Sequence, residues 1–211
     1  MKGFIILGLS VSSVLSAQTD STQIKEIQEV SFTRRLPVSK EIINVQKDLG
    51  SKNLGQDLPI LLKNQMSVVA TSDAGNGVGY TGFRIRGSAG TSINVMLNGV
   101  PYNDSESQGT FFVNIPDMAS SASQIVIQRG VGTSSNGTAS FGASVNILTK
   151  NPDEKPYVLG QFSAGSFNTM KTSFEAGSGK FLNNLLSVSA RYSTINSDGY
   201  IDRAFSKLNS Y

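Results

Sequence analysis

Short runs of alternating apolar and polar residues, separated by turns rich in glycine and asparagine, dominate the middle of the chain. The stretch from Gly82 to Asp104, GFRIRGSAGTSINVMLNGVPYND, contains two of them. Period-two alternation predicts strands with two unlike faces. In all, strands are predicted at residues 66–71, 82–87, 93–99, 123–130 and 143–150, and one helix at residues 55–64. Residues 46–150 are therefore predicted to form a compact α+β domain with a small mixed sheet.

The pattern changes after Asn151 and Pro152. Alternation there extends over longer segments, at residues 158–164, 170–176 and 186–193, with turn formers between them. Segments of about ten alternating residues are typical of the wall of an outer-membrane β-barrel. A soluble antiparallel meander shows the same alternation, and it stays an alternative on this pattern alone.

The N-terminus indicates export. Lys2 precedes an apolar run from Phe4 to Leu15, and the small Ala17 is followed by polar residues. The run is too short to cross a bilayer as a helix, which favours a signal peptide over residues 1–17 rather than a buried N-terminal element. No later segment offers ~20 consecutive apolar residues, so no membrane-spanning helix is predicted.

Composition narrows the possible functions. The 211 residues include no histidine and no cysteine, which removes thiol nucleophiles, disulfides, Ser-His-Asp triads and the commonest metal ligand. We therefore expect a protein that is not an enzyme, with no catalytic residue, no metal site and no cofactor. The net charge of +3 is spread along the chain, so no nucleic-acid partner is predicted.

Two motifs are weaker than they look. Residues 77–82 match the G-x-G-x-x-G pattern of nucleotide sites, but they lead into a predicted strand rather than a helix. A flexible loop is therefore favoured over a nucleotide site. Asp104 and Glu106 could act as paired carboxylates, although a solvated loop is the favoured interpretation.

Residues 18–45 are predicted to be a polar extension with one alternating patch, bounded by Arg34, Arg35 and Pro37. The patch has no partner nearby in the sequence, so we expect it to add to the sheet edge of another protein. An edge strand of the following domain is the alternative. The residues of the patch are Ile27, Gln28, Glu29, Val30, Ser31, Phe32 and Thr33.

Four motifs in this order, GFRIRG, NVMLNGVPYND, IVIQRGVGT and FGASVNILTK, closely resemble the N-terminal plug domain of TonB-dependent outer-membrane receptors. The resemblance covers residues 46–150, and residues 113–142 resemble versions from Bacteroidetes. It implies that the patch at 27–33 is a TonB box and that residues 151–211 are the first strands of a 22-stranded β-barrel around the plug. Such a barrel needs several hundred further residues, so the chain is expected to be a fragment or a truncated form.

The resemblance implies energy-coupled uptake across the outer membrane, with TonB as the partner. The cargo would be a scarce small molecule, such as a ferric siderophore, haem, cobalamin or another metal chelate, and no residue selects among them. The alternative is a secreted or periplasmic plug-like binding module without transport. A long continuation of alternating strands would distinguish the transporter from that module.

By similarity, Arg84, Arg86 and Arg129 lie on strands and meet carboxylates of the inner barrel wall, although solvent-facing arginines are the alternative. The glycine-rich domain is expected to have little apolar core and therefore to open at a low free energy. Two loops resemble plug apices that touch substrate. Their candidate residues are Asp73, Asn76, Tyr80, Tyr102, Asn103 and Asp104.

Overall fold

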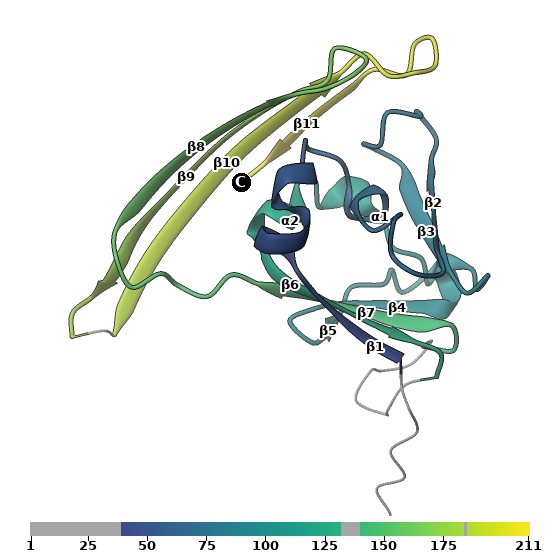
Figure 1. Ribbon diagram of the computed structural model, residues 1–211, viewed down its shortest axis with the longest axis horizontal. Helices are drawn as coiled ribbons and strands as arrows, with labels where there is room; N and C mark the ends of the chain where they lie inside the picture. The colour runs from purple at the N-terminus through teal and green to yellow at the C-terminus, as the bar shows by residue number, and fades with distance from the viewer. Residues whose placement is uncertain (1–38, 132–139, 184) are drawn as a thin grey trace, which may run out of the picture. The chain divides into compact units, whose positions relative to one another are not determined.

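The computed structural model describes residues 39–131, 140–183 and 185–211, which form an α+β domain followed by long antiparallel strands (Figure 1). The predicted signal peptide (1–17) and the predicted TonB box (27–33) lie outside the described residues. Both stay predictions.

The domain is built on a mixed sheet with the strand order β1-β6-β7-β4-β5. Strand β7 pairs antiparallel with β6 and parallel with β4, while β6 pairs antiparallel with β1 on its other side. The predicted mixed sheet is therefore confirmed. Its strands are β1 (Ser39–Asn44), β4 (Ile93–Leu97), β5 (Val100–Pro101), β6 (Ala122–Arg129) and β7 (Ala143–Thr149).

Strand β1 is an addition to the predicted domain. The sheet starts at Ser39, inside the segment assigned from sequence to the polar extension, and not at residue 46. The strand pairs with β6 along its whole length. Lys40 and Glu41 make β1 look polar in the sequence, and only the long-range pairing with β6 shows that it belongs to the sheet.

A second, two-stranded sheet joins β2 (Val68–Ser72) to β3 (Thr81–Ile85). The helix predicted at 55–64 is only the single turn α1 (Leu58–Leu61), because the chain folds back after Leu62 through turns. The other short elements are the π-helical turn η1 (Val45–Leu49), the 3₁₀ turns η2 (Gly50–Lys52), η3 (Gly90–Ser92) and η4 (Phe112–Asn114), and α2 (Met118–Ser121).

The expectation of little apolar core is wrong. One continuous hydrophobic cluster joins the mixed sheet to η1, α1 and β3. Polar residues fill the loops, while the buried strand positions are largely apolar, with Asn94, Ser144 and Arg129 as buried polar exceptions. The fully buried members of the hydrophobic cluster include Ile85, Ile93, Val95, Ile125, Ile127, Val145 and Ile147.

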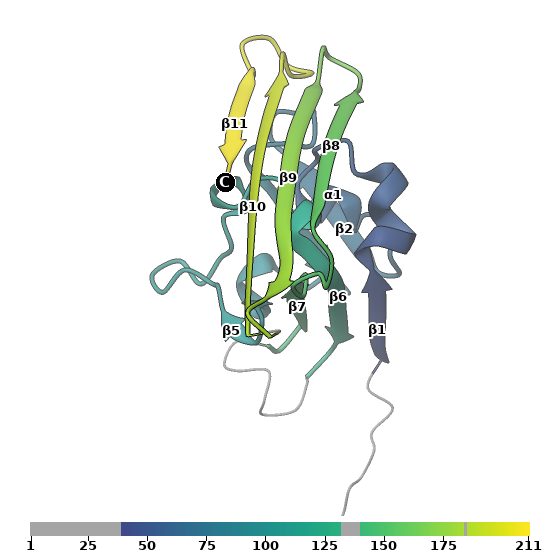
Figure 2. The ribbon, with the colours of Figure 1, turned by 90° about the vertical axis from the view of Figure 1, so that its left-hand side faces the viewer.

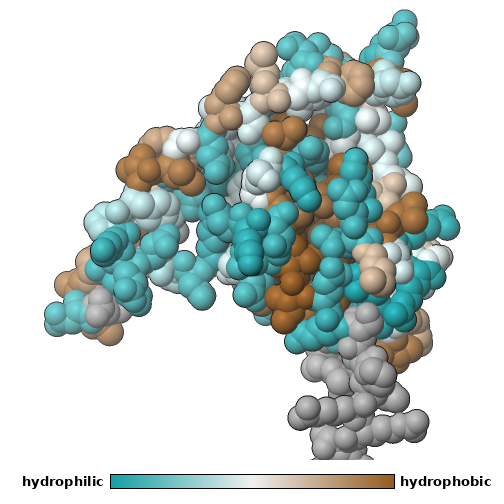
Figure 3. All heavy atoms as spheres, in the orientation of Figure 1, coloured by the Kyte–Doolittle hydropathy of each residue, from teal (hydrophilic) through white to brown (hydrophobic). Residues whose placement is uncertain are grey.

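The chain then forms a four-stranded antiparallel sheet with the order β11-β10-β9-β8, called the wall below (Figures 1 and 2). Hydrophobic residues such as Val158, Phe174 and Val188 are exposed on one face. Figure 3 shows hydrophobic patches among hydrophilic side chains over the wall. Polar residues such as Lys171 and Ser193 are buried on the other. The strands are β8 (Tyr157–Ala164), β9 (Met170–Phe181), β10 (Leu186–Ser197) and β11 (Ser206–Ser210).

The helices of the described residues are all too short or too polar to cross a membrane.

Ile127 tests the apolar core, and Ile42 on the neighbouring strand is its matched control. Ile127 is 0% exposed and Ile42 is 58% exposed. Ile127→Ala should lower the free energy of unfolding by about 2–5 kcal/mol, because it leaves a cavity. Ile42→Ala should change it by less than about 1 kcal/mol. Urea denaturation of the purified protein measures both, and equal effects would contradict the assignment of this core.

Candidate functional site

The domain and the wall meet at a buried ion cluster around Asp117, which precedes α2. The Lys171 Nζ of β9 lies 2.6 Å from Asp117 Oδ1, and the Arg191 Nη1 of β10 lies 2.9 Å from Asp117 Oδ2. The side chains of Asp117 and Lys171 are 0% and 1% exposed. A single carboxylate of the domain therefore binds cations from two adjacent wall strands.

Serine hydroxyls complete the cluster, which we call the Asp117 anchor. Ser120 accepts a hydrogen bond from Lys171 Nζ at 2.8 Å and donates one to Asp117 Oδ1 at 2.6 Å. Arg191 donates to Ser121 at 2.9 Å and to Ser210 of β11 at 2.8 Å. The bonds matter because buried charges are costly to desolvate unless their remaining donors and acceptors are satisfied.

The backbone of Asp117 is held in the left-handed region, with φ 53° and ψ 30°. A non-glycine residue is uncommon there, although aspartate is among the residues that tolerate it best. This conformation presents both carboxylate oxygens to the wall. Strained backbone of this kind persists only where surrounding contacts determine it, and here the two cations supply those contacts.

The three predicted contact arginines have different environments. Arg129 is buried on β6, where its guanidinium pairs with Glu41 of β1 and its Nε donates to the Met66 carbonyl at 3.0 Å. Arg84 is exposed on β3. Arg86 is also exposed, and its placement on a strand was wrong, since it lies in the following turn with φ 52°. Contact of these arginines with a complete barrel stays a prediction.

The loop between β2 and β3 contacts the loop between β10 and β11. Asn76 Nδ2 donates to Ser197 Oγ at 2.9 Å, and the Tyr200 amide donates to the Ala74 carbonyl at 3.1 Å. Gly75 (φ 72°) lies so close to Tyr200 that a Cβ at this position would be 3.0 Å from the Tyr200 Cβ. Asn76, one of the predicted substrate-facing loop residues, thus lies beside the wall.

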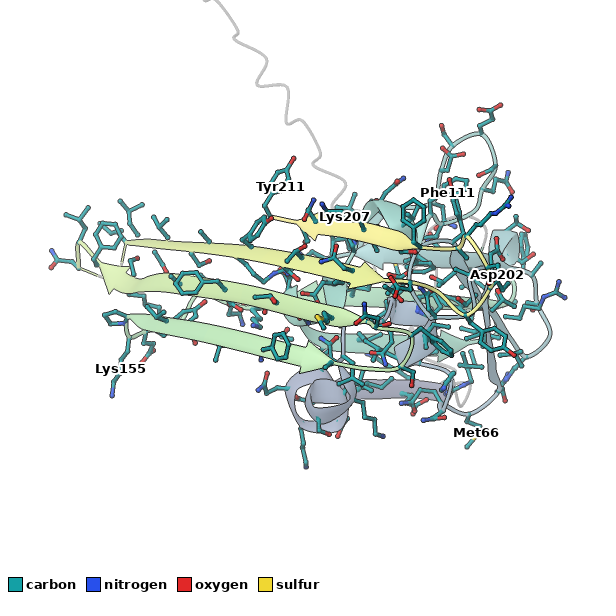
Figure 4. All side chains as sticks on the ribbon, turned by 90° about the horizontal axis from the view of Figure 1, so that it is seen from above. Met66, Phe111, Lys155, Asp202, Lys207 and Tyr211 are labelled. Atoms are coloured by element: carbon teal, nitrogen blue, oxygen red, sulfur yellow. The ribbon has the colours of Figure 1, made fainter. Side chains whose placement is uncertain are left out.

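A mostly apolar cleft of about 450 Å³ opens between these two loops. Tyr80 and Phe205 line it and are 64% and 76% exposed, and Asp73 is its only carboxylate among the residues that the structure describes. Figure 4 shows Asp202 of the β10–β11 loop at the end of the wall nearest the domain, with Lys155 at the opposite end. The other lining residues include Val78, Val113, Ile201 and Leu208.

The second predicted loop is used for internal structure. The Asn103 side chain accepts from the Val95 amide at 2.7 Å and donates to the carbonyls of Ile93 and Gln108 at 3.0 and 2.8 Å. Asn103 therefore braces the end of β4. Asp104 Oδ2 accepts from the backbone amide and the hydroxyl of Ser107, and these bonds lower the pKa of Asp104.

Glu106 is exposed in the loop that follows β5, and Asp104 is partly exposed there. No group of three or more acidic side chains that could hold a metal ion occurs in residues 39–131, 140–183 and 185–211. Tyr102 is half-buried, and its amide donates to the Val95 carbonyl at 2.8 Å. The G-x-G-x-x-G segment leads into β3 without a helix, which agrees with a loop.

Asp57 ties the β2–β3 loop to the core. Its amide donates to the Gly77 carbonyl at 2.9 Å, and its Oδ2 accepts from the Thr81 hydroxyl at 2.9 Å. Burial raises the pKa of the Asp57 carboxyl to about 6, although hydrogen bonds from Thr81 and from the Gly79 amide act in the opposite direction. Asp57 as a whole is 2% exposed.

Sequence reasoning missed Asp117, Lys171, Arg191 and Asp57. Lys171 and Arg191 occupy the polar positions of alternating strands, and that pattern identifies them as inward-facing. Their partner could not be found in the same way, because Asp117 lies in an irregular segment far away in sequence. Asp57, before Leu58 and Pro59, has the sequence position of a helix N-cap, but nothing local indicates its burial.

Asp57 should make stability depend on pH. Its pKa is higher in the folded protein, about 6, than in the unfolded chain, about 3.9. The folded state therefore binds more protons between these values, and stability falls as pH rises from about 4 to about 6. Urea denaturation across this range measures the free energy of unfolding. As pH rises, this free energy should fall in the wild type by up to about 3 kcal/mol more than in Asp57→Asn.

Thr81→Val is the companion variant for Asp57. This variant removes a hydrogen bond that lowers the pKa of the Asp57 carboxyl. The pH range over which stability falls should therefore move upward, while stability still depends on pH. An unchanged pH profile in Asp57→Asn would contradict the assignment.

Comparisons with known proteins agree with this arrangement. The family model described as "TonB-dependent Receptor Plug Domain" matches residues 33–144. No curated protein matches the chain. Among solved structures, the alcaligin outer membrane receptor FauA from Bordetella pertussis is similar with a TM-score of 0.61 and 16% identity, over 79% of this chain and 27% of that chain.

Two further solved structures show the same fold. The pyoverdine outer membrane receptor FpvA from Pseudomonas aeruginosa PAO1 has a TM-score of 0.57 and 14% identity, over 76% of this chain and 22% of that one. The siderophore receptor PirA from Acinetobacter baumannii has a TM-score of 0.56 and 18% identity, over 75% of this chain and 24% of that chain. The chain thus spans about a quarter of their length. The family model covers more than half of the chain, which therefore belongs to the TonB-dependent receptors through its plug domain.

Proposed function

We propose that the protein is exported to the outer membrane and takes up a scarce substrate there, with energy supplied through TonB. The Asp117 anchor is the observation that carries this proposal. It fixes the plug to the polar face of a sheet whose other face exposes hydrophobic side chains. A plug held against a polar lumen wall, with lipid on the far side, is the arrangement that such a transporter requires.

The wall is proposed to be the start of the barrel that encloses the plug. Its strands alternate between exposed apolar residues and buried polar residues, as transmembrane barrel strands do. Its two outer strands, β8 and β11, have one partner each within the described residues. Further strands pairing with these edges would satisfy their backbone groups, as lipid requires.

The cargo is proposed to be a metal chelate of the siderophore class. PirA is described as a siderophore receptor, FpvA as a pyoverdine receptor and FauA as an alcaligin receptor, and this supports the class without selecting a compound. The cleft between the β2–β3 and β10–β11 loops suits the apolar or aromatic part of such a molecule. Asp73 and Tyr80 at this cleft are the two predicted substrate-facing residues best placed to touch it.

The TonB box can be tested at Val30. Val30→Pro removes a backbone donor from the patch 27–33, so a partner strand could no longer pair there. Val30→Thr keeps the donor and the β-branched shape, and it serves as the control. Calorimetry with the purified C-terminal domain of TonB should show at least about tenfold weaker binding for Val30→Pro. Equal binding by wild type and Val30→Pro would contradict the assignment of residues 27–33 as the TonB box.

Tyr80 tests the cargo cleft. Tyr80→Ala should weaken binding of a ferric siderophore that supports growth under iron limitation by about tenfold, because an aromatic contact surface is lost. Tyr192→Ala is the matched control, since Tyr192 is 52% exposed on the wall away from the cleft. Binding of the radiolabelled ferric complex to whole cells measures both variants. Equal losses, or no loss in Tyr80→Ala, would place the cargo elsewhere.

A further inference from the structure

We propose that the buried carboxyl of Asp57 is a proton-operated latch on the β2–β3 loop. While Asp57 carries a proton, the segment 77–80 of this loop stays seated against α1, and the cargo cleft keeps the shape described above. Loss of the proton releases the segment and changes the cleft. The inference rests on the proposed function only for the role of the cleft, since the latch itself is a property of the plug.

The side chain of Asp57 is turned away from the helix that it precedes. Asp57 has the N-cap position of α1, and its carbonyl accepts from the Ile60 and Leu61 amides at 3.0 and 3.2 Å. Its carboxylate makes no capping hydrogen bond, although an N-cap aspartate usually accepts one from the first turn. The carboxylate is therefore available to the β2–β3 loop.

Three hydrogen bonds join Asp57 to the end of this loop. The Asp57 amide donates to the Gly77 carbonyl at 2.9 Å. The carboxylate accepts from the Thr81 hydroxyl at 2.9 Å and from the Gly79 amide. Gly77 also packs so closely on α1, beside β2 and β3 in Figure 1, that a Cβ there would be 3.3 Å from the Ile60 Cγ2. One residue of the core thus holds the segment 77–80 in place.

The carboxylate of Asp57 is badly placed to hold a negative charge. Asp57 is buried, and its Oδ1 accepts no hydrogen bond from the residues that the structure describes. A buried carboxylate with an unsatisfied oxygen favours the protonated form. Burial accordingly outweighs the two hydrogen bonds and raises the pKa of Asp57 to about 6. The seated loop therefore binds a proton more tightly than a loop that admits water.

No ion pair to Asp57 occurs within the described part of the chain. Helix α1 and strand β2 contain no charged residue. On the other surrounding elements the charged or titratable groups are Lys63 after α1, Asp73 and Tyr80 in the β2–β3 loop, Arg84 on β3, Lys171 on β9, and Asp198, Asp202 and Arg203 in the β10–β11 loop. Lys171 is bound to Asp117, and the others are exposed. A proton, rather than a neighbouring cation, is thus what neutralises Asp57.

The two halves of the loop are held by different partners. Residues 74–76 are bound to the wall, through the Ala74 carbonyl and the Asn76 side chain. The segment 77–80 is held by Asp57. Gly77 and Gly79, with φ of 83° and 92°, flank Val78 and give this segment the backbone freedom to move. Release would therefore move 77–80 while 74–76 stay on the wall.

The segment 77–80 also forms one side of the cargo cleft. Val78, Gly79 and Tyr80 line it, and Val78 is 0% exposed in the seated conformation. Movement of the segment would expose Val78 and displace the Tyr80 ring. The protonation of Asp57, which lies beneath this segment, is thereby coupled to the shape of the cleft.

Proton linkage sets the direction of the effect. The pKa of Asp57 is about 6 in the seated loop, and in a released loop open to water it should approach the ordinary value of about 3.9. A rise in pH from about 4 to about 6 should therefore shift the equilibrium toward release by up to about a hundredfold. Outside this range both states bind the same number of protons, so the equilibrium should not change further.

Hydrogen exchange on the full-length protein in outer-membrane vesicles tests the latch. After correction for intrinsic exchange rates, the opening constant of amides 77–80 should rise at least about tenfold between pH 4 and pH 7. Asp57→Asn should abolish this rise, because the amide cannot ionise. The amides of β7 are the internal control, since a general loss of stability would affect them as well. The same pH dependence in β7, or an unchanged rise in Asp57→Asn, would overturn the proposal.

Thr81 provides a matched pair that keeps Asp57 itself. Thr81→Val removes the hydroxyl that lowers the pKa of the Asp57 carboxyl, so the midpoint of the opening curve should move to higher pH. Thr81→Ser keeps the hydroxyl and should retain the wild-type midpoint. Equal midpoints in the two variants would contradict the latch, even if Asp57→Asn fails to fold.

Binding of the radiolabelled ferric complex used for Tyr80 separates the latch from the proposed function. Between pH 4 and pH 7, wild-type affinity relative to that of Asp57→Asn should fall at least about threefold, because the seated cleft becomes less populated. This ratio cancels any effect of pH on the complex itself. If exchange of 77–80 follows pH as expected and the ratio stays constant, the cargo cleft, and not the latch, is contradicted.

Discussion

The buried carboxylate of Asp117 between Lys171 and Arg191 is the interaction on which the arrangement of the chain depends. Water is excluded there, so the charges interact strongly, and neither the domain nor the wall can keep its own charges buried without the other. The two cations come from adjacent strands, and Arg191 also reaches Ser210 of the next strand. One side chain of the domain thereby binds two wall strands, and Arg191 links them to the third. The apolar core and the wall pairing hold each part together, and the Asp117 anchor holds the parts to one another.

The polar character of the sequence has two separate structural causes. In the wall, buried serines and charged residues face the domain because the lumen side of a barrel strand is not apolar. In the domain, polar residues fill loops and brace strand ends, as Asn103 does for β4. Neither role competes with a hydrophobic core, which the mixed sheet builds from alternate positions such as Ile125 and Ile127. A plug can therefore have a hydrophilic surface and still resist opening at its centre.

Period-two alternation was enough to predict the central strands and the change of pattern at the wall, because that signal is local. The predictions that failed depended on non-local facts. Strand β1 contains Lys40 and Glu41, and only its pairing with β6 makes it part of the sheet. Arg86 was predicted on a strand, but its left-handed backbone conformation places it in the turn that follows β3. The anchor could not be inferred at all, since Asp117 meets partners 54 and 74 residues further along the chain.

The direction in which Lys171 points has a consequence for assembly. Its neighbours Met170 and Thr172 are exposed on the opposite face of β9, so a pairing slip of one residue would bring one of them to Asp117 and turn the lysine toward the exposed apolar face. Such a slip leaves a buried carboxylate without its cation and places a charged side chain among exposed hydrophobic ones. The folded domain thus favours one register for the strands of the wall.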